Sequence, residues 1–156
     1  MTEIKTPFFL CNHTHEECYN TPMNINEFKN HLSEEFGEDE VNNFIEKFGE
    51  KDLKYFNDIL EAKNKLLECS SLSDDEATTA VVEFIDNFSI IELGNIQDSF
   101  NGKHASLLEF ATQLFDDCYI GEIPKNLRVY VDYKKFCDDI RFDYLITESG
   151  IVFCKN

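Results

Sequence analysis

The stretch "IPKNLRVYVDYKKFCDDIRFDYLITESGIVF", from Ile123 to Phe153, decides the fold of the last third of the chain. Within it, the segment DYKKFCDDI has apolar residues at helical spacing, and DYLIT-ESG-IVFC alternates in polarity on both sides of a turn that contains Gly150. The stretch therefore predicts a short helix followed by a β-hairpin. It contains no nucleophile beside a base, no glycine-rich phosphate loop and no set of four metal ligands.

Upstream of this stretch the pattern is mainly helical. Four amphipathic helices are expected in the middle of the chain: NINEFKNHLSEEF and EDEVNNFIEKF, which end at Gly37 and Gly49, a longer helix from about Lys51 to Glu68, and SDDEATTAVVEFIDNF. Ser73 and Glu76 have the spacing of a capping box at the start of the last of these helices.

The segments between the helical middle and the C-terminal hairpin complete the fold class. GNIQDSFNGKH predicts a short strand and a turn that ends at Asn101–Gly102, and SLLEFATQLFDDC predicts another amphipathic helix. We expect an α+β fold with three parts. These are an N-terminal segment (1–22) that could include a strand, an acid-rich helical region (23–92) and a small C-terminal domain of antiparallel strands and helices (93–156).

Charge is the most unusual property of the chain. It has 31 acidic and 14 basic residues, a formal net charge of −17, and no Lys or Arg between Leu66 and Gly102. Because like charges repel at close range, direct binding to nucleic acid or to an anionic membrane is disfavoured, and a basic partner is favoured.

The spacing of the acids gives this charge a second interpretation. Between Glu27 and Asp98 there are 19 acids in 72 residues, one in every 3.8. At a helical rise of ~1.5 Å per residue, one carboxylate occurs every ~6 Å, a spacing comparable with that of phosphates along a DNA strand. Helices with outward acids could therefore imitate a phosphate backbone. The alternative is that the acids serve solubility alone.

The N-terminal sequence CNHTHEEC is the only apparent metal-ligand cluster. If this segment is a strand, Cys11, His13 and His15 share one face, and Cys18 could complete a tetrahedral zinc site. The alternative is a strand whose polar face happens to include two histidines. Four ligands within eight residues are a tight arrangement, so this is a weak candidate and no metal or other cofactor is expected.

No catalytic residues are expected elsewhere, and the chain does not read as an enzyme. His31 and His104 are isolated in the sequence. Adjacent acids such as Asp116–Asp117 and Asp138–Asp139 point about 100° apart on a helix, so they do not converge on one ion. No segment approaches the ~20 apolar residues of a membrane span, and we expect a cytoplasmic protein with reduced thiols.

The sequence from about residue 95 to residue 153 resembles the ArdA antirestriction family. The similarity covers an Asp-small-aromatic stretch that leads to a Gly, a Ser-initiated helix with acidic-Phe-Ala, an Ile-Pro-x-x-Leu motif, an aromatic-x-Asp-Tyr helix and a final strand. The matching positions are Ile96, Asp98, Ser99, Phe100, Gly102, Ser106, Glu109, Phe110, Ala111, Ile123, Pro124, Leu127, Tyr130, Asp132, Tyr133, Phe136, Asp139, Ile140, Gly150 and Phe153. The first 70 residues depart from the family pattern, which includes a Trp that this chain lacks.

The resemblance implies a function that composition only suggests. ArdA proteins are acidic mimics of bent duplex DNA, usually dimeric through the C-terminal domain, and are carried by mobile elements and plasmids. They occupy the DNA-binding groove of type I restriction–modification enzymes, so a type I enzyme is the expected partner and a homodimer the expected state.

We expect distributed carboxylates to form the partner-binding surface, with no single one indispensable. The candidates are Glu34, Glu35, Glu38, Asp39, Glu46, Asp74, Asp75, Glu76, Glu83, Asp86, Asp98, Asp116, Asp117 and Glu122. Two alternatives stay open at this point. One is an acidic interaction module with an ArdA-like domain but another basic partner, and the other is a small zinc-binding protein that uses the N-terminal Cys/His cluster.

Overall fold

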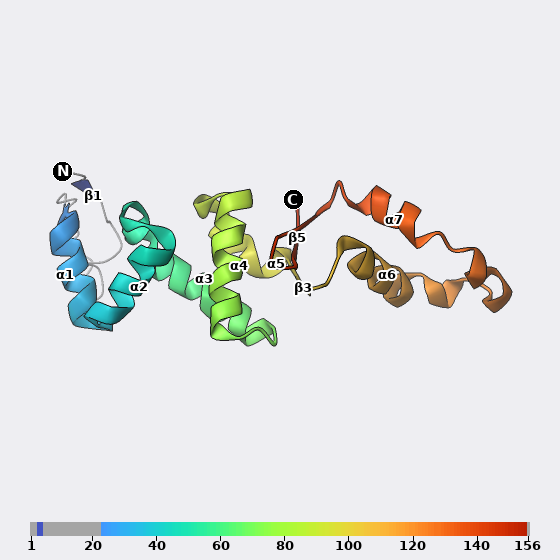
Figure 1. Ribbon diagram of the computed structural model, residues 1–156, viewed down its shortest axis with the longest axis horizontal. Helices are drawn as coiled ribbons and strands as arrows, with labels where there is room; N and C mark the ends of the chain where they lie inside the picture. Colours follow the sequence, from blue (N-terminus) through green and yellow to red (C-terminus); the bar gives the residue numbers. More distant parts are fainter. Residues whose placement is uncertain (1–2, 5–22, 156) are drawn as a thin grey trace, which may run out of the picture. The chain divides into compact units, whose positions relative to one another are not determined.

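The computed structural model describes residues 3–4 and 23–155, and its fold divides into two compact units (Figure 1). The first unit ends at Asp58 and the second begins at Ile59, so the division falls within helix α3. Helices predominate and the strands are short and antiparallel, which confirms the α+β fold class. Apart from residues 3–4, the expected N-terminal segment lies outside the described residues.

The first unit consists of one short strand pair and consecutive helices. Its elements are β1 (Glu3–Ile4), β2 (Met23–Asn24), α1 (Ile25–Phe36), α2 (Glu38–Phe48), the 3₁₀ helix η1 (Glu50–Tyr55) and the start of α3 (Phe56–Cys69). The two strands are antiparallel, with Ile4 opposite Met23.

Local capping sets the limits of these helices, and the two closing glycines agree with the sequence prediction. The Asn24 side chain accepts a hydrogen bond of 3.0 Å from the Asn26 amide, and the Glu27 carboxylate accepts one from the Asn24 amide. Gly37 and Gly49 end α1 and α2 with φ angles of 96° and 91°, a conformation that costs other residues more than glycine.

The apolar faces of these helices form the core of the first unit. Phe28, Leu32 and Val41 are fully buried, and the Phe56 ring lies 4.9 Å, centroid to centroid, from the ring of Phe44. This packing also explains one error in the sequence prediction.

The single helix expected from about Lys51 to Glu68 is wrong at its start, because η1 precedes α3. Leu53 and Phe56 are three residues apart and both buried, and a 3₁₀ turn brings i and i+3 onto the same side.

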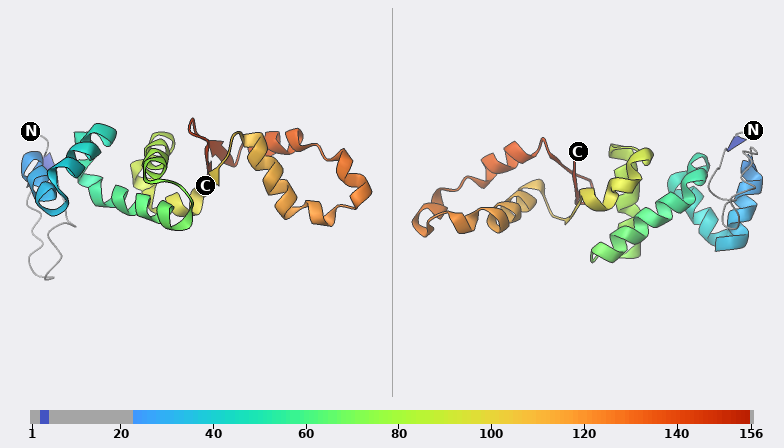
Figure 2. Two further views of the ribbon diagram at one scale, coloured as in Figure 1. Left: turned by 60° about the horizontal axis from the view of Figure 1, so that its bottom comes forward. Right: turned by 180° about the vertical axis from the view of Figure 1, so that it is seen from behind.

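The second unit combines helices with a three-stranded sheet. Its elements after α3 are α4 (Asp74–Asn87), η2 (Ile90–Asn95), α5 (Ile96–Ser99), β3 (Phe100–Lys103), α6 (Leu107–Cys118), η3 (Ile120–Glu122), η4 (Lys125–Tyr130), α7 (Tyr133–Ile140), β4 (Tyr144–Ile146) and β5 (Ile151–Cys154). The helices α6 and α7 lie side by side and are joined through η3 and η4 (Figures 1 and 2).

The sheet has the order β3-β5-β4, with both pairs antiparallel. The hairpin formed by β4 and β5 confirms the sequence prediction, and the Gly150 amide closes its turn by a 3.0 Å bond to the Thr147 carbonyl. Gly150 has a φ of +87°, and a Cβ atom there would lie 2.5 Å from the His104 carbonyl oxygen. No other residue fits this position without movement of the backbone.

The core of the second unit surrounds the sheet. Phe153 of the central strand packs edge-on against Phe84 of α4, with ring centroids 5.2 Å apart. Val152 points into a cluster with Phe110 of α6 and Ile140 of α7. The central strand therefore contacts α4 through one side chain and the α6–α7 pair through the next.

The expected strand and turn in GNIQDSFNGKH is wrong in detail. Ile96–Ser99 forms the short helix α5, because Ile96 and Ser99 are both buried at helical spacing. The strand comprises only Phe100–Lys103, and Asn101–Gly102 lies inside it, at an irregularity of the pairing with β5. Gly102 has a φ of +88°, typical of a bulge.

The helices in residues 23–155 are all too short or too polar to cross a membrane.

Candidate partner-binding surface

The described residues do not assemble a metal site. Residues 3–4 and 23–155 contain no group of three or more His, Cys, Asp or Glu side chains arranged to hold an ion. The weak zinc candidates Cys11, His13, His15 and Cys18 lie outside the described residues.

His104, which is isolated in the sequence, packs against neighbouring residues of the fold. Its ring packs against Phe110 at a centroid distance of 5.1 Å, and its Nε2 atom lies 3.0 Å from the Asn101 carbonyl oxygen. These contacts hold the chain between β3 and α6, so His104 has a structural role there.

Most of the acidic residues expected to bind a partner are exposed. Of the fourteen candidates, twelve have exposed side chains: Glu34, Glu35, Glu38, Asp39, Glu46, Asp74, Asp75, Asp86, Asp98, Asp116, Asp117 and Glu122. Some of these carboxylates have neighbours within the chain. Asp74, for example, lies 2.8 Å from the Lys63 ammonium group.

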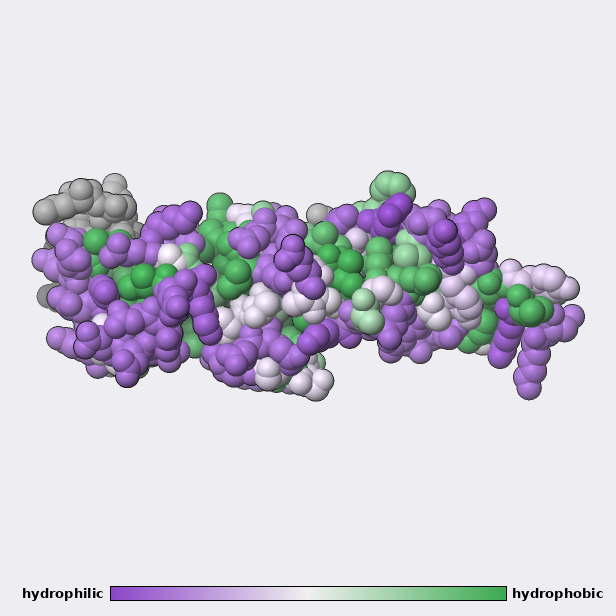
Figure 3. All heavy atoms as spheres, in the orientation of Figure 1, coloured by the Kyte–Doolittle hydropathy of each residue, from purple (hydrophilic) through white to green (hydrophobic). Residues whose placement is uncertain are grey.

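The densest group of acids surrounds the junction of α1 and α2. Five exposed acids, three of them in the first turn of α2, lie within the seven residues 34–40. No Lys or Arg occurs from residue 30 to residue 46. Hydrophilic side chains cover most of the visible face of these two helices (Figure 3). A surface of this kind attracts closely spaced cations.

Several acids stand where the helix dipole disfavours them. The C-terminal end of a helix carries partial negative charge, so a carboxylate there costs about 0.3–1 kcal/mol at the surface. Helices α1, α3, α4 and α6 have no base in their last turns. The acids in those turns are Glu34, Glu35, Glu68, Asp86, Asp116 and Asp117. Stability of the helices does not explain these positions.

Glu76 is held by contacts inside the second unit. It forms a capping box with Ser73 at the start of α4, and its Oε1 atom lies 2.6 Å from the Lys103 ammonium group of β3. The hydrogen bond from Lys103, followed by those from Ser73, lowers the pKa of Glu76 from 4.5 to about 2. Lys103 is the only base between Lys65 and Lys125, and this ion pair offsets its charge.

Glu83 is likewise engaged within the unit. Its carboxylate accepts hydrogen bonds from the amide and the hydroxyl group of Ser149, in the turn of the hairpin. Glu76 and Glu83 therefore differ from the twelve exposed acids because each carboxylate is bonded to the sheet region, Glu76 through Lys103 and Glu83 through Ser149.

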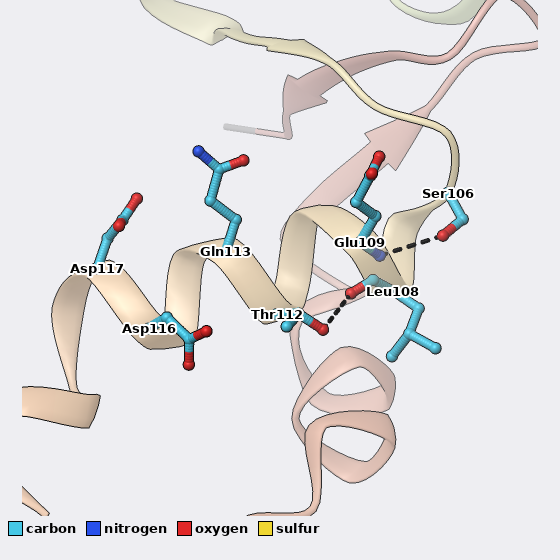
Figure 4. Close-up of a pocket in the computed structure, with 7 residues that line it drawn as sticks. All are labelled: Ser106, Leu108, Glu109, Thr112, Gln113, Asp116 and Asp117. Atoms are coloured by element: carbon cyan, nitrogen blue, oxygen red, sulfur yellow. Dashed lines mark hydrogen bonds between the residues drawn. The ribbon is translucent and has the colours of Figure 1, made fainter.

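The outer face of α6 carries a row of polar side chains over a shallow, open hollow (Figure 4). Glu109, Gln113 and Asp117 project to one side of the helix, at intervals of four residues. Asp116 projects to the other side and accepts a 2.6 Å hydrogen bond from the Tyr133 hydroxyl group, which raises the pKa of Tyr133. The hollow is too open to enclose a small molecule.

An exposed apolar patch in η4 was not predicted from the sequence. Leu127, Val129 and Tyr130 are 48%, 79% and 80% exposed. They occur in a stretch that includes the bases Lys125 and Arg128. The signal was present in the apolar run "VYV" (129–131), which lies between Arg128 and Asp132, but an apolar run of this length does not show whether a side chain faces solvent.

Comparison with known proteins gives this acidic surface a context. A family model described as "Antirestriction protein (ArdA)" matches residues 9–153. The chain belongs to the ArdA family. The ArdA match includes much of the N-terminal part, although that part lacks the expected Trp. No curated protein and no solved structure matched the chain.

Membership of the ArdA family makes the chain an antirestriction protein, and it implies a restriction enzyme as the partner. ArdA proteins are inhibitors rather than enzymes, in keeping with a surface on which the described acids are spread over many helices.

Proposed function

We propose that this protein is a DNA mimic that binds the DNA-binding groove of a type I restriction–modification enzyme and inhibits it without catalysis. Its exposed carboxylates take the positions of DNA phosphates and contact the Lys and Arg side chains that normally hold the duplex. Inhibition is then stoichiometric, because the protein blocks the site and changes no bond. The protein acts in the cytoplasm, where restriction enzymes meet incoming DNA, and its gene is carried by a mobile element that it protects.

The observation that carries this proposal is the presence of acids in the last turns of α1, α3, α4 and α6, where no base balances them. An acidic protein that needs only solubility can place its carboxylates at helix N-termini, where the dipole favours them. Acids at both ends of a helix make its surface negative along its whole length. The phosphates of a DNA strand form a continuous row of negative charge in the same way.

The electrostatics of the second unit support the same proposal. Between residues 66 and 122 there are twelve acids and one base, and that base, Lys103, is paired with Glu76. A basic groove that approaches this stretch therefore meets little opposing positive charge. Since exposed ion pairs contribute about 1 kcal/mol or less each, affinity has to come from many such contacts.

We also propose that the protein is a homodimer and that the C-terminal part, residues 93–156, is the domain that pairs. The exposed patch of Leu127, Val129 and Tyr130 supports this, because apolar side chains at such exposure gain from burial against a second copy. The nearby Lys125 and Arg128 reduce the repulsion between two strongly acidic chains.

The experiment that tests the inhibition is DNA cleavage by a type I restriction enzyme with increasing amounts of the protein, at two salt concentrations. We expect inhibition at near-stoichiometric amounts that weakens as salt rises, because salt screens exposed ion pairs. Absence of inhibition across several type I enzymes would contradict the proposed target. Binding to a different basic protein would then favour the interaction-module alternative.

A further inference from the structure

Glu83 of α4 is bonded to the hairpin turn between β4 and β5, 66 residues away in the chain. The Ser149 amide donates a 3.1 Å hydrogen bond to Glu83 Oε1, and the Ser149 hydroxyl group donates a second bond to Oε2. A carboxylate that accepts two bonds from one residue is held in direction as well as in position.

The turn that Glu83 holds is itself well fixed. The Gly150 amide bonds to the Thr147 carbonyl at 3.0 Å, and the Ile151 amide bonds to the Thr147 hydroxyl oxygen at 3.1 Å. Thr147 is buried, and the Gly150 carbonyl accepts a 2.8 Å bond from the His104 amide. Ser149 is therefore a firm anchor for α4 rather than part of a loose loop.

A second contact joins the same side of α4 to the sheet. Glu76 lies seven residues, about two helical turns, before Glu83, and it pairs with Lys103 at the end of β3. Together the two carboxylates attach α4 to the sheet at two points about 10 Å apart along the helix axis.

An adjoining side of α4 carries exposed acids, of which Asp75 also borders a small hollow beside Lys103 and Ser149. Asp75 and Asp86 are eleven residues apart, which is close to three full turns, so they lie in one line along the helix. This line is rotated by roughly 80° from the line of Glu76 and Glu83. The buried face of α4, which includes Val81 and Phe84, packs against the core, and the bonds of Glu76 and Glu83 add two polar contacts to this packing. The direction of the exposed acids therefore depends on both kinds of contact.

We propose that Glu83 is a positioning residue: by its bonds to Ser149 it fixes the rotation of α4, so that Asp75 and Asp86 face the partner, and it does not itself contact the partner. The inference rests on the proposed function, and it assigns Glu83 a different role from the one expected from the sequence. It divides the acids of α4 into those that bind the enzyme and those that orient the helix.

The test uses four single variants of the full chain and measures their affinity for a type I restriction enzyme across a range of salt. Ser149→Ala removes one bond to Glu83 without changing the net charge. Glu83→Gln removes a charge from the positioning side, and Asp86→Asn removes one from the exposed side. Thr79→Ala is the control for Ser149→Ala, because its hydroxyl group donates a 2.9 Å hydrogen bond to the Asp75 carbonyl oxygen within α4 rather than to Glu83. Circular dichroism at the assay temperature establishes that each variant is folded.

The slope of log affinity against log salt separates the two roles, because it counts the ionic contacts in the complex. We expect Ser149→Ala and Glu83→Gln each to weaken binding by roughly tenfold with the wild-type slope, because losing a hydrogen bond to a charged group lowers the fraction of molecules in which α4 has the binding orientation, while the molecules that bind keep all their ionic contacts. We expect Asp86→Asn to lower the slope and Thr79→Ala to change neither quantity. In the double variant of Glu83 and Ser149 the losses should not add, because the two residues share one contact.

Two results would overturn the inference while leaving the proposed function intact. One is that Ser149→Ala binds the enzyme with wild-type affinity while Asp86→Asn binds it more weakly. The other is a slope for Glu83→Gln that falls as much as that of Asp86→Asn, since Glu83 would then be a direct contact. If the wild-type protein binds no type I enzyme, the proposed function fails first and the inference fails with it.

Discussion

Two stretches of the second unit have opposite surface chemistry. Residues 66–122 contain twelve acids and one base, whereas residues 123–142 contain three acids and five bases. Three of the exposed large apolar side chains, Leu127, Val129 and Tyr130, lie together in the second stretch. One small unit therefore carries two kinds of surface: a carboxylate surface suited to a basic groove, and an apolar, mildly basic surface suited to a second copy of the chain.

Gly150 offers the largest expected effect, because it lies in the turn that leads into β5, the central strand of the sheet. We expect Gly150→Ala to lower the free energy of unfolding by about 3 kcal/mol or more, since the new Cβ would clash with the His104 carbonyl at a positive φ. Chemical denaturation measures this loss. The control is Gly94→Ala, where nothing lies within 4 Å and stability should change little. Equal effects of the two variants would refute the account of the turn.

The apolar surface can be changed by substitution while the acidic surface is left intact. We expect Val129→Asp combined with Tyr130→Asp to convert a dimer to a monomer in sedimentation equilibrium, because each removes an exposed apolar side chain and adds repulsion. Ile91→Asp is the matched control, since Ile91 is 84% exposed but lies in η2, outside the patch. A dimer that survives the double change but not Ile91→Asp would place the interface elsewhere.

Inhibition should depend on how many exposed acids are changed rather than on which acid is changed. Six exposed acids of the first stretch can be changed to their amides together and one at a time: Glu68, Asp86, Glu92, Asp98, Asp117 and Glu122. We expect each single change to weaken inhibition by about fivefold or less and the combination to abolish it at assay concentrations, because exposed ion pairs are individually weak. A single amide change that abolished inhibition in a folded protein would contradict distributed mimicry.

The acids at helix C-termini offer a sharper distinction between stability and binding. We expect Glu34→Gln with Glu35→Gln to raise the free energy of unfolding by about 0.3–1 kcal/mol for each change, while inhibition weakens. The comparison pair is Glu38→Gln with Asp39→Asn at the start of α2, which should lower stability and also weaken inhibition. If the first pair left stability unchanged or lowered it, the argument from the helix dipole would be lost.

The smallest expected effect concerns pH. Because the folded-state pKa of Glu76 is lowered to about 2, its contribution to stability is fully present above pH 4.5 and is lost as pH falls toward 2. Lys103→Met removes the main cause of that shift. The difference in denaturation midpoint between wild type and Lys103→Met should therefore shrink as pH is lowered through this window. A difference that is constant over the window would show that the Lys103–Glu76 pair contributes nothing.

The features that sequence predicted well are local. The capping box of Ser73 and Glu76 and the glycines that end α1 and α2 depend on residues within four positions, and all are confirmed. The partners that were missed are distant in the chain: Glu83 meets Ser149 across 66 residues and Glu76 meets Lys103 across 27. The sequence shows only that Glu76 and Glu83 are acidic, so it does not distinguish them from the exposed acids nearby.

The remaining errors have the same origin in tertiary packing. The 3₁₀ start before α3 is favoured by the joint burial of Leu53 and Phe56, and the helical turn at Ile96–Ser99 by burial of its two end residues. Neither segment has a cap or a periodic pattern strong enough to show this in the sequence. The acidic surface, by contrast, could be anticipated, because exposure is the usual state of a charged side chain.

The most direct test of the central claim is a binding measurement with three components: a type I restriction enzyme, a fluorescent duplex that contains its target sequence, and this protein. If carboxylates occupy the DNA groove, the protein displaces the duplex fully, and raising the salt concentration weakens this displacement. The duplex and the protein then compete for one site, so each lowers the apparent affinity of the enzyme for the other. A stable ternary complex of enzyme, DNA and protein would contradict the account.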